Sequence, residues 1–195
     1  QAETIIMRLN RASGLSGLAS VRQATKWRQD LWLLRPLLTW RKASLIALCQ
    51  SENIDFFNDP SNQAMQFDRS KIRASLANQD YQISNWARSV ANLAEANDAL
   101  EWAVDQIMRS RVAHISDDNG ANYRFDYQGL PNELIFRTMA RLLGIMGEKP
   151  EGGQIANAII ELNQGQIINF GRVKIIPRAN NNHNIWEFKP LKAKA

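Results

Sequence analysis

The chain has 195 residues, of which 45% are hydrophobic, a content that is ordinary for a globular protein with a substantial core and that excludes a disordered tail. Its 24 Lys and Arg residues outnumber its 19 Asp and Glu residues, and this largely arginine surplus favours an anionic partner, with nucleic acid preferred over a membrane surface. One cysteine and two histidines exclude an internal disulfide framework and a Cys/His zinc cluster.

Apolar residues at helical spacing predict a helix from the first residues to about Arg11. No N-cap precedes it, so we expect the chain to begin in mid-helix, as a fragment would. The next segment, SGLSG at 13–17, is either a loop that brings backbone amides close to a ligand or a plain glycine C-cap and turn. No long apolar run and no secretory signal are present, which predicts a cytoplasmic protein without membrane contact.

A short α/β pattern follows. Residues 31–34 predict a buried strand, 44–53 a helix and 54–57 a second strand. Because a strand, a helix and a strand in this order usually place the two strands parallel, we interpret residues 1–76 as the end of an α/β domain.

The segment DPSNQAMQFDRSKIR at 59–73 concentrates charged and hydrogen-bonding side chains without apolar periodicity. A solvated linker is one interpretation. The alternative is a functional segment in which a turn positions Arg69, Lys71 and Arg73 toward a polyanion.

Residues 83–107 carry apolar side chains at alternating steps of three and four, which predicts a helix of about seven turns that packs lengthwise against a partner. Asn97 occupies the one place where this rhythm expects an apolar residue. Arg88, Arg109 and Arg111 lie off the apolar seam, either as a solvated face or as an RNA-facing stripe.

The remaining sequence predicts a strand at 123–127, helices from about Pro131 and at 154–163, and short strands joined by an Asn-rich turn at the end. The expected fold is therefore an α/β segment followed by a mainly α-helical domain with a small β element. Its expected divisions are 1–76, a helical domain at 77–163, and a β-containing tail at 164–195.

No complete catalytic motif is present in the chain. Four stretches nevertheless follow one another at the order and spacing of a known family: QAETIIMRLNRASGLSGLA, LLRPLL, DPSNQAMQFDRSKIR and LPNELIFRTMARLLG. Together they resemble the bacterial tRNA(Ile)-lysidine synthetases. The resemblance implies a Rossmann-like ATP-pyrophosphatase domain that activates the C2 carbonyl of the wobble cytidine with ATP. The ε-amine of free lysine then displaces AMP and forms lysidine.

The resemblance also implies site residues and partners, and a tRNA-binding role for the helical domain at 77–163. Arg11, Arg69 and Arg73 would be catalytic; Glu3, Arg11, Ser13 and Gly14 would bind ATP; and Lys71, Arg88, Arg109 and Arg111 would contact RNA. The partners would be ATP, Mg²⁺, free lysine and a tRNA(Ile) with a CAU anticodon.

Three departures from the family pattern matter. The family's SGGxDS phosphate loop and its His-x-x-Asp-Asp metal-binding segment are absent, and its usual Arg-Gly-Ser-Gly is Arg11-Ala12-Ser13-Gly14 here. We therefore expect the 195-residue chain by itself to be inactive. Two alternatives to an enzyme are an RNA-binding module without chemistry and a helical scaffold that forms a homodimer through the long helix.

Overall fold

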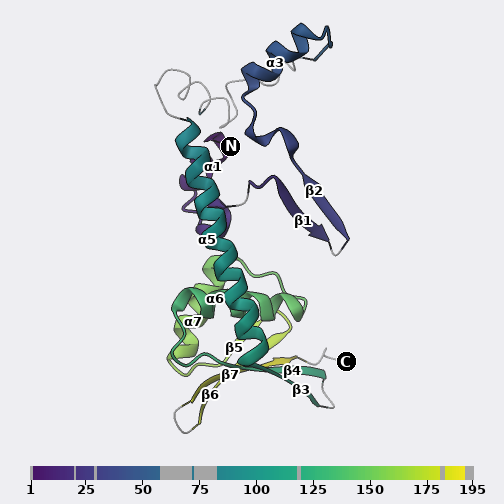
Figure 1. Cartoon of the computed structure of the whole chain (residues 1–195). Helices are drawn as coiled ribbons and strands as arrows, with labels where there is room; N and C mark the ends of the chain where they lie inside the picture. Colours follow the sequence, from purple (N-terminus) through teal and green to yellow (C-terminus); the bar gives the residue numbers. More distant parts are fainter. Residues whose placement is uncertain are drawn as a thin grey trace. The chain divides into compact units, whose positions relative to one another are not determined.

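The computed structural model of the chain describes residues 2–19, 21–28, 30–57, 72, 83–117, 120–180 and 183–191. The protein divides into two compact units, Gln1–Asp98 and Ala99–Ala195, and each is described by itself (Figure 1). The division falls inside the long helix α5 (Ile83–Ser110), and so differs from the predicted boundaries at residues 76 and 163. Both units combine helices and strands, so the chain is mixed α/β.

The first unit opens with α1 (Ala2–Leu9), which confirms the predicted first helix. Glu3 in its first turn and Arg8 in its last turn both suit the helix dipole. A turn at residues 10–12 leads into α2 (Leu15–Leu18), a single helical turn inside the segment where only a loop or a glycine cap was expected.

Two antiparallel strands follow, β1 (Ala24–Arg28) and β2 (Leu31–Leu34), with Ala24 opposite Leu34. The predicted strand at 31–34 is confirmed, but its predicted burial is wrong, because all four residues are exposed. The predicted parallel arrangement of strand 31–34, helix 44–53 and strand 54–57 is wrong, because residues 54–57 form no strand and β2 pairs only with β1 among the described residues.

After β2 come the 3-10 helix η1 (Pro36–Thr39) and the helix α3 (Lys42–Ser51). The helix predicted at 44–53 is confirmed. The strand predicted at 54–57 is wrong, since these residues belong to no strand or helix. Ile54, Phe56 and Phe57 are all exposed, so apolar composition alone was misleading there.

The seam of α5 confirms the predicted long helix. Val90 in the first unit, and Val104 and Ile107 in the second, are buried at the predicted seam positions. Asn97, the polar interruption, is only 8% exposed and therefore also faces inward.

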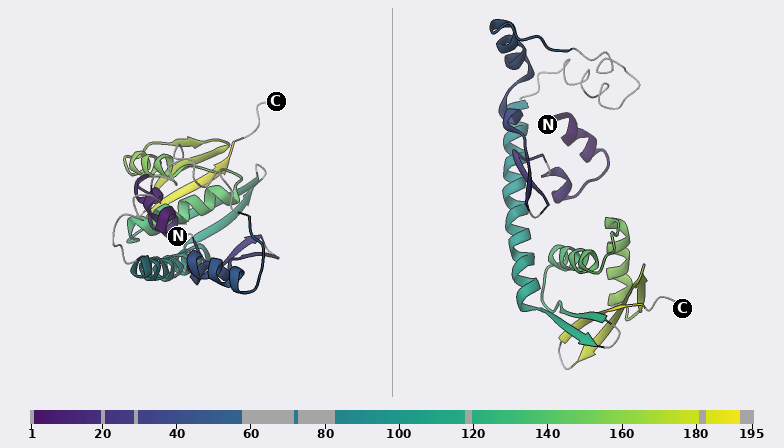
Figure 2. Two further views of the ribbon diagram at one scale, coloured as in Figure 1. Left: turned by 90° about the horizontal axis from the view of Figure 1, so that it is seen from above. Right: turned by 90° about the vertical axis from the view of Figure 1, so that its right-hand side faces the viewer.

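The second unit is a five-stranded antiparallel sheet with helices on one face (Figure 2). Its strands are β3 (Val112–Asp117), β4 (Gly120–Asp126), β5 (Ile168–Phe170), β6 (Val173–Asn180) and β7 (His183–Pro190), in the spatial order β3-β4-β7-β6-β5. The helices are α6 (Asn132–Ile145) and α7 (Gly152–Asn163), both close to their predicted positions.

One apolar core joins the helices to the sheet. It consists of Ile107, Phe125, Ile135, Met139, Leu142, Leu143, Ile155, Ala158, Leu162, Val173, Ile175, Trp186 and Phe188. Full burial of one large apolar side chain stabilises a fold by about 1.5–3 kcal/mol, so this cluster is the main source of the unit's stability.

The sheet corrects the predicted mainly helical domain with a separate β tail. Strand β7 pairs with β4 on one side and with β6 on the other, so residues 112–126 and 168–190 form one sheet. The pairing of Phe125 with Trp186 joins segments about sixty residues apart in the sequence, a relation that local periodicity does not reveal.

Candidate functional site

The turn after α1 is a tight helix C-cap. The backbone N–H of Ala12 donates to the carbonyl of Leu9 (2.9 Å), and that of Ser13 donates to the carbonyl of Arg8 (2.9 Å). Ala12 itself is left-handed, with φ of 50°. This pair of bonds around a left-handed residue is the Schellman motif, which satisfies the last carbonyl groups of a helix.

Side chains fix the rest of this glycine-containing loop. The Arg8 guanidinium donates to the carbonyl of Gly17 and so ties the end of α1 to α2. A Cβ atom at Gly17 would lie 2.9 Å from the Cβ of Ser13, so only glycine fits there without displacement. At Gly14, by contrast, the backbone is extended with φ of −70°, and a Cβ would meet nothing within 4 Å.

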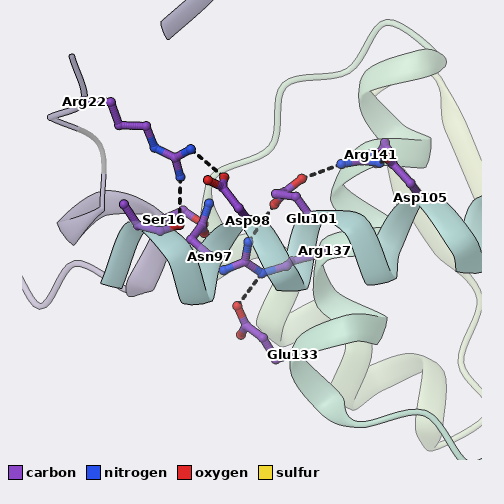
Figure 3. A network of polar contacts seen from close by, with 10 residues as sticks. Ser16, Arg22, Asn97, Asp98, Glu101, Asp105, Glu133, Arg137 and Arg141 are labelled. Atoms are coloured by element: carbon purple, nitrogen blue, oxygen red, sulfur yellow. Dashed lines mark hydrogen bonds and ion pairs between the residues drawn. The ribbon is translucent and has the colours of Figure 1, made fainter. Parts of the chain in front are cut away.

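The loop is anchored to the first-unit part of α5 (Figure 3). Ser16 Oγ donates to Asn97 Oδ1 at 3.1 Å, and the Arg22 guanidinium forms an ion pair with Asp98. Arg22 also donates to the carbonyls of Ala94 (3.3 Å) and Ala19 (3.4 Å). The polar break in the seam therefore receives a hydrogen bond from the loop.

A second arginine joins the loop to the hairpin. Arg35, in the LLRPLL stretch, donates to the carbonyl of Arg22 (3.0 Å) and to Thr25 Oγ1 (3.3 Å). Its own backbone N–H donates to the carbonyl of Gln23 (2.6 Å). This stretch thus holds the start of β1, the end of β2 and the Arg22 peptide in one arrangement.

The structure brings together only part of the predicted ATP-binding set. Arg11, Ser13 and Gly14 share one turn, with Arg11 and Gly14 exposed and Ser13 half-buried. Glu3 lies in the first turn of α1, about 9 Å along the axis from the last residue of that helix at a rise of about 1.5 Å per residue. Its predicted role in ATP binding stays a prediction.

The structure describes only some of the cationic residues predicted to contact ATP or RNA. Arg69, Lys71 and Arg73 lie outside the described residues. Arg88 in the first unit and Arg109 in the second are exposed on α5.

Arg111 lies just beyond α5, where its guanidinium donates to the carbonyl of Gln128 at 2.8 Å. The carbonyl of Arg111 accepts the backbone N–H of Asp126 at 3.0 Å. Arg111 therefore fastens the end of β4, and its role as an RNA contact stays a prediction.

A second polar cluster joins α6 to the second-unit part of α5 (Figure 3). Arg137 is only 7% exposed and pairs with Glu101 (2.6 Å) and Glu133 (2.7 Å). Arg141, which is 30% exposed, pairs with Glu101 and Asp105. These ion pairs orient two packed helices, which is a structural role.

Within the described ranges, no group of three or more His, Cys, Asp or Glu side chains is placed to hold a metal ion. No metal-dependent step is therefore assigned to these residues. Among the same ranges, no helix combines the length and the apolar character needed to span a membrane.

Comparison with known proteins identifies the family. Residues 1–80 match a family model described as a PP-loop domain. A tRNA(Ile)-lysidine synthase from Novosphingobium aromaticivorans is 35% identical over 178 residues, which cover 89% of this chain and 53% of that protein. The enzyme of the same name from Bradyrhizobium diazoefficiens is 35% identical over 175 residues, which cover 84% of this chain and 48% of that protein. The enzyme from Zymomonas mobilis is 31% identical over 177 residues, which cover 85% of this chain and 51% of that protein.

The chain belongs to the tRNA(Ile)-lysidine synthase family. It spans about half the length of the curated relatives that it matches. The anchored glycine-containing loop lies within residues 1–80, the part of the chain that matches the PP-loop domain model.

Sequence reasoning missed the residues that hold this loop in place. Arg8, Arg22 and Arg35 each donate to backbone carbonyl groups, and Arg22 also reaches Asp98. The only signal in the sequence was the polar residue at position 97, which marked where α5 receives something other than an apolar side chain.

Proposed function

We propose that this chain forms part of an ATP-dependent carbon–nitrogen ligase that attaches lysine to C2 of the wobble cytidine in a tRNA(Ile) with a CAU anticodon. The proposal rests on one observation, the match to tRNA(Ile)-lysidine synthases over 89% of the chain. Since the substrates would be ATP, free lysine and tRNA, the reaction would take place in the cytoplasm.

The reaction has two balanced steps. The C2 oxygen of the cytidine attacks the α-phosphorus of ATP, pyrophosphate leaves, and an adenylated cytidine remains. The ε-amine of lysine then attacks C2, the C–N bond forms, and the C2 oxygen leaves with AMP. Negative charge develops on phosphate oxygens in the first step, so preorganised cationic donors around the phosphates lower its barrier.

In this proposal, the loop after α1 binds ATP through the Arg11 cation and through backbone groups that the ligand can approach closely. The Arg11 guanidinium is exposed beside Ser13 and Gly14, in a turn whose backbone is fixed by the Arg8 and Ala12 contacts. A turn held in this way needs little reorganisation when charge develops on a bound phosphate. The open space around Gly14 leaves room for a ligand atom at the backbone.

Arg69 and Arg73 supply the further catalytic guanidinium groups in this proposal, and Lys71, Arg88, Arg109 and Arg111 supply contacts to tRNA phosphates. ATP is expected to enter with Mg²⁺. The described residues offer no ligand cluster for this ion, so no step is assigned to it here.

The test is steady-state kinetics of lysidine formation in full-length enzyme, with mass spectrometry of the tRNA product. Arg73→Ala and Arg69→Ala should each lower turnover by roughly a hundredfold if they contact the transition state. Lys71→Ala should instead weaken tRNA binding and reduce its salt dependence by about one unit. Lys42→Ala, an exposed residue of α3, is the charge-matched control and should leave both quantities unchanged.

The competing function is an RNA-binding module without chemistry, which the surplus of Lys and Arg over Asp and Glu would also suit. Under that alternative, the protein binds tRNA but releases no pyrophosphate when tRNA and ATP are both present. Wild-type kinetics for all three variants at positions 69, 71 and 73 would likewise refute their assignment to the site.

A further inference from the structure

The five-stranded sheet of the second unit has one open face. Phe125, Trp186 and Phe188 belong to the core that also contains buried residues of α6 and α7, so residues that alternate with them along the strands point to the opposite side. In the described part of this unit, no helix packs on that opposite side (Figure 1).

Four cationic side chains share this open side. Arg124 on β4 is directly opposite Glu187 on β7, and Lys174 on β6 is opposite Lys189 on β7. Arg178 lies on the same side of β6 because its guanidinium also contacts Glu187. We name Arg124, Lys174, Arg178 and Lys189 the outer basic face; it extends over three adjacent strands.

Glu187 lies at the centre of these cations and organises them. Its carboxylate is 3.4 Å from Arg124, 3.3 Å from Arg178 and 3.5 Å from Lys189. Glu187 is only 5% exposed, while the side chains of Arg124 and Arg178 are 55% and 57% exposed. The acid is therefore covered by the cations, while more than half of the Arg124 and Arg178 side-chain surface stays exposed to solvent.

The charge on this face is positive at neutral pH. Burial by itself would raise the pKa of Glu187, but Lys189, Arg178 and Arg124 outweigh it and hold that pKa below its ordinary value of 4.5. The carboxylate is therefore ionised and offsets only one of the four positive charges. The nearby Asp126 carboxylate accepts the backbone N–H of Gln128 (3.0 Å) at the end of β4.

The size of the face fits a nucleic-acid backbone. Neighbouring strands are about 4.8 Å apart and alternate residues along a strand are about 6.8 Å apart, so the four cations cover a patch roughly 10 Å across the strands and roughly 14 Å along them. One nucleic-acid strand advances about 3.4 Å per nucleotide, which brings several phosphates over such a patch. The planar guanidinium groups match phosphodiester oxygens in a bidentate manner.

A lipid surface fits less well. Proteins that bind membranes at the interface insert large apolar side chains beside their basic residues. In the described part of this unit, the exposed large apolar residues lie on helices or outside the strand ends: Trp102, Ile145, Ile160, Ile167 and Leu191.

We propose that the outer basic face binds the sugar–phosphate backbone of RNA, with Glu187 holding its cations in a fixed array. This inference rests on the proposed tRNA-modifying function and deepens it by naming a contact surface on a sheet rather than on α5.

The experiment measures tRNA binding by the full 195-residue chain as a function of salt concentration, using fluorescence anisotropy. Arg178→Ala and Lys174→Ala should each weaken binding by roughly three- to tenfold at low salt and reduce the salt slope by about one unit. Lys149→Ala is the control, because this exposed residue between α6 and α7 makes the same charge change away from the sheet strands. Circular dichroism confirms that each variant folds.

Arg178→Lys adds a test of geometry, since it keeps the charge and should retain the salt slope while losing part of the affinity. Three outcomes would overturn the inference: a wild-type chain that does not bind tRNA, outer-face variants that bind like the Lys149 control, or binding only to vesicles of anionic phospholipid. The proposed function fails on a different readout, the absence of lysidine from full-length enzyme, so each can fail while the other survives.

Discussion

Ala12 occupies the left-handed position of the α1 C-cap, where glycine is the favoured residue. We expect Ala12→Gly to stabilise the first unit. A left-handed L-residue costs about 1–2 kcal/mol relative to the right-handed conformation, and glycine removes that cost. Glycine also loses about 0.5–1 kcal/mol more conformational entropy on folding. The net gain is therefore about 0.5–1 kcal/mol, or a rise of about 2–8 °C in the melting temperature of a unit of this size.

The assay is thermal and urea unfolding of the full chain followed by circular dichroism. Ala47→Gly is a matched control in the same unit, because Ala47 is exposed inside the regular helix α3. There the same chemical change should destabilise by about 0.8–1 kcal/mol, so the two variants should move in opposite directions. If Ala12→Gly lowers the free energy of unfolding as Ala47→Gly does, the left-handed strain at position 12 has been assigned wrongly.

Three further outcomes are expected. Gly17→Ala should destabilise the first unit by about 1–3 kcal/mol, because the new Cβ has no room. Gly14→Ala should fold normally and lower only ATP-dependent activity. Equal melting temperatures for the two variants would contradict the packing described at Gly17. Arg137→Met should destabilise the second unit by about 2–3 kcal/mol and the more exposed Arg141→Met by at most about 1 kcal/mol, as urea unfolding will show. Because the folded-state pKa of Glu187 is lowered, the stabilisation from this carboxylate is present above the unfolded-state pKa and is lost as the pH falls below about 4.5. Glu187→Gln should therefore flatten the dependence of the unfolding free energy on pH in this acidic range. An unchanged pH dependence would exclude the effect.

Local patterns predicted the helices well. The seam at Val90, Val104 and Ile107 and the apolar stripe of α6 follow from side-chain spacing, which depends only on neighbours within one element. The short apolar run at 31–34 predicted a strand but not its exposure, since burial depends on what packs against it. Composition also favoured a strand at 54–57, where no pairing partner is present among the described residues.

The sheet of the second unit shows why the rest could not be predicted. Strand β7 lies between β4 and β6, and that order is set by contacts between distant segments such as Phe125 and Trp186. Each strand taken alone was compatible with a tail or an edge. Only the pairing shows that Arg124 and Glu187, far apart in sequence, meet on one face and make it basic.

The candidate site has the same mixture of local and distant determinants. The Schellman turn after α1 depends on adjacent residues, and it holds Ala12, where the family usually has glycine, in the left-handed conformation. Its attachment to α5 depends on Ser16 reaching Asn97 across about eighty residues. An apolar residue at position 97 would complete the seam of the helix but could not accept that hydrogen bond. The break in the heptad pattern therefore marks a position where α5 contacts the loop, because Asn97 makes a specific polar contact there in place of apolar burial.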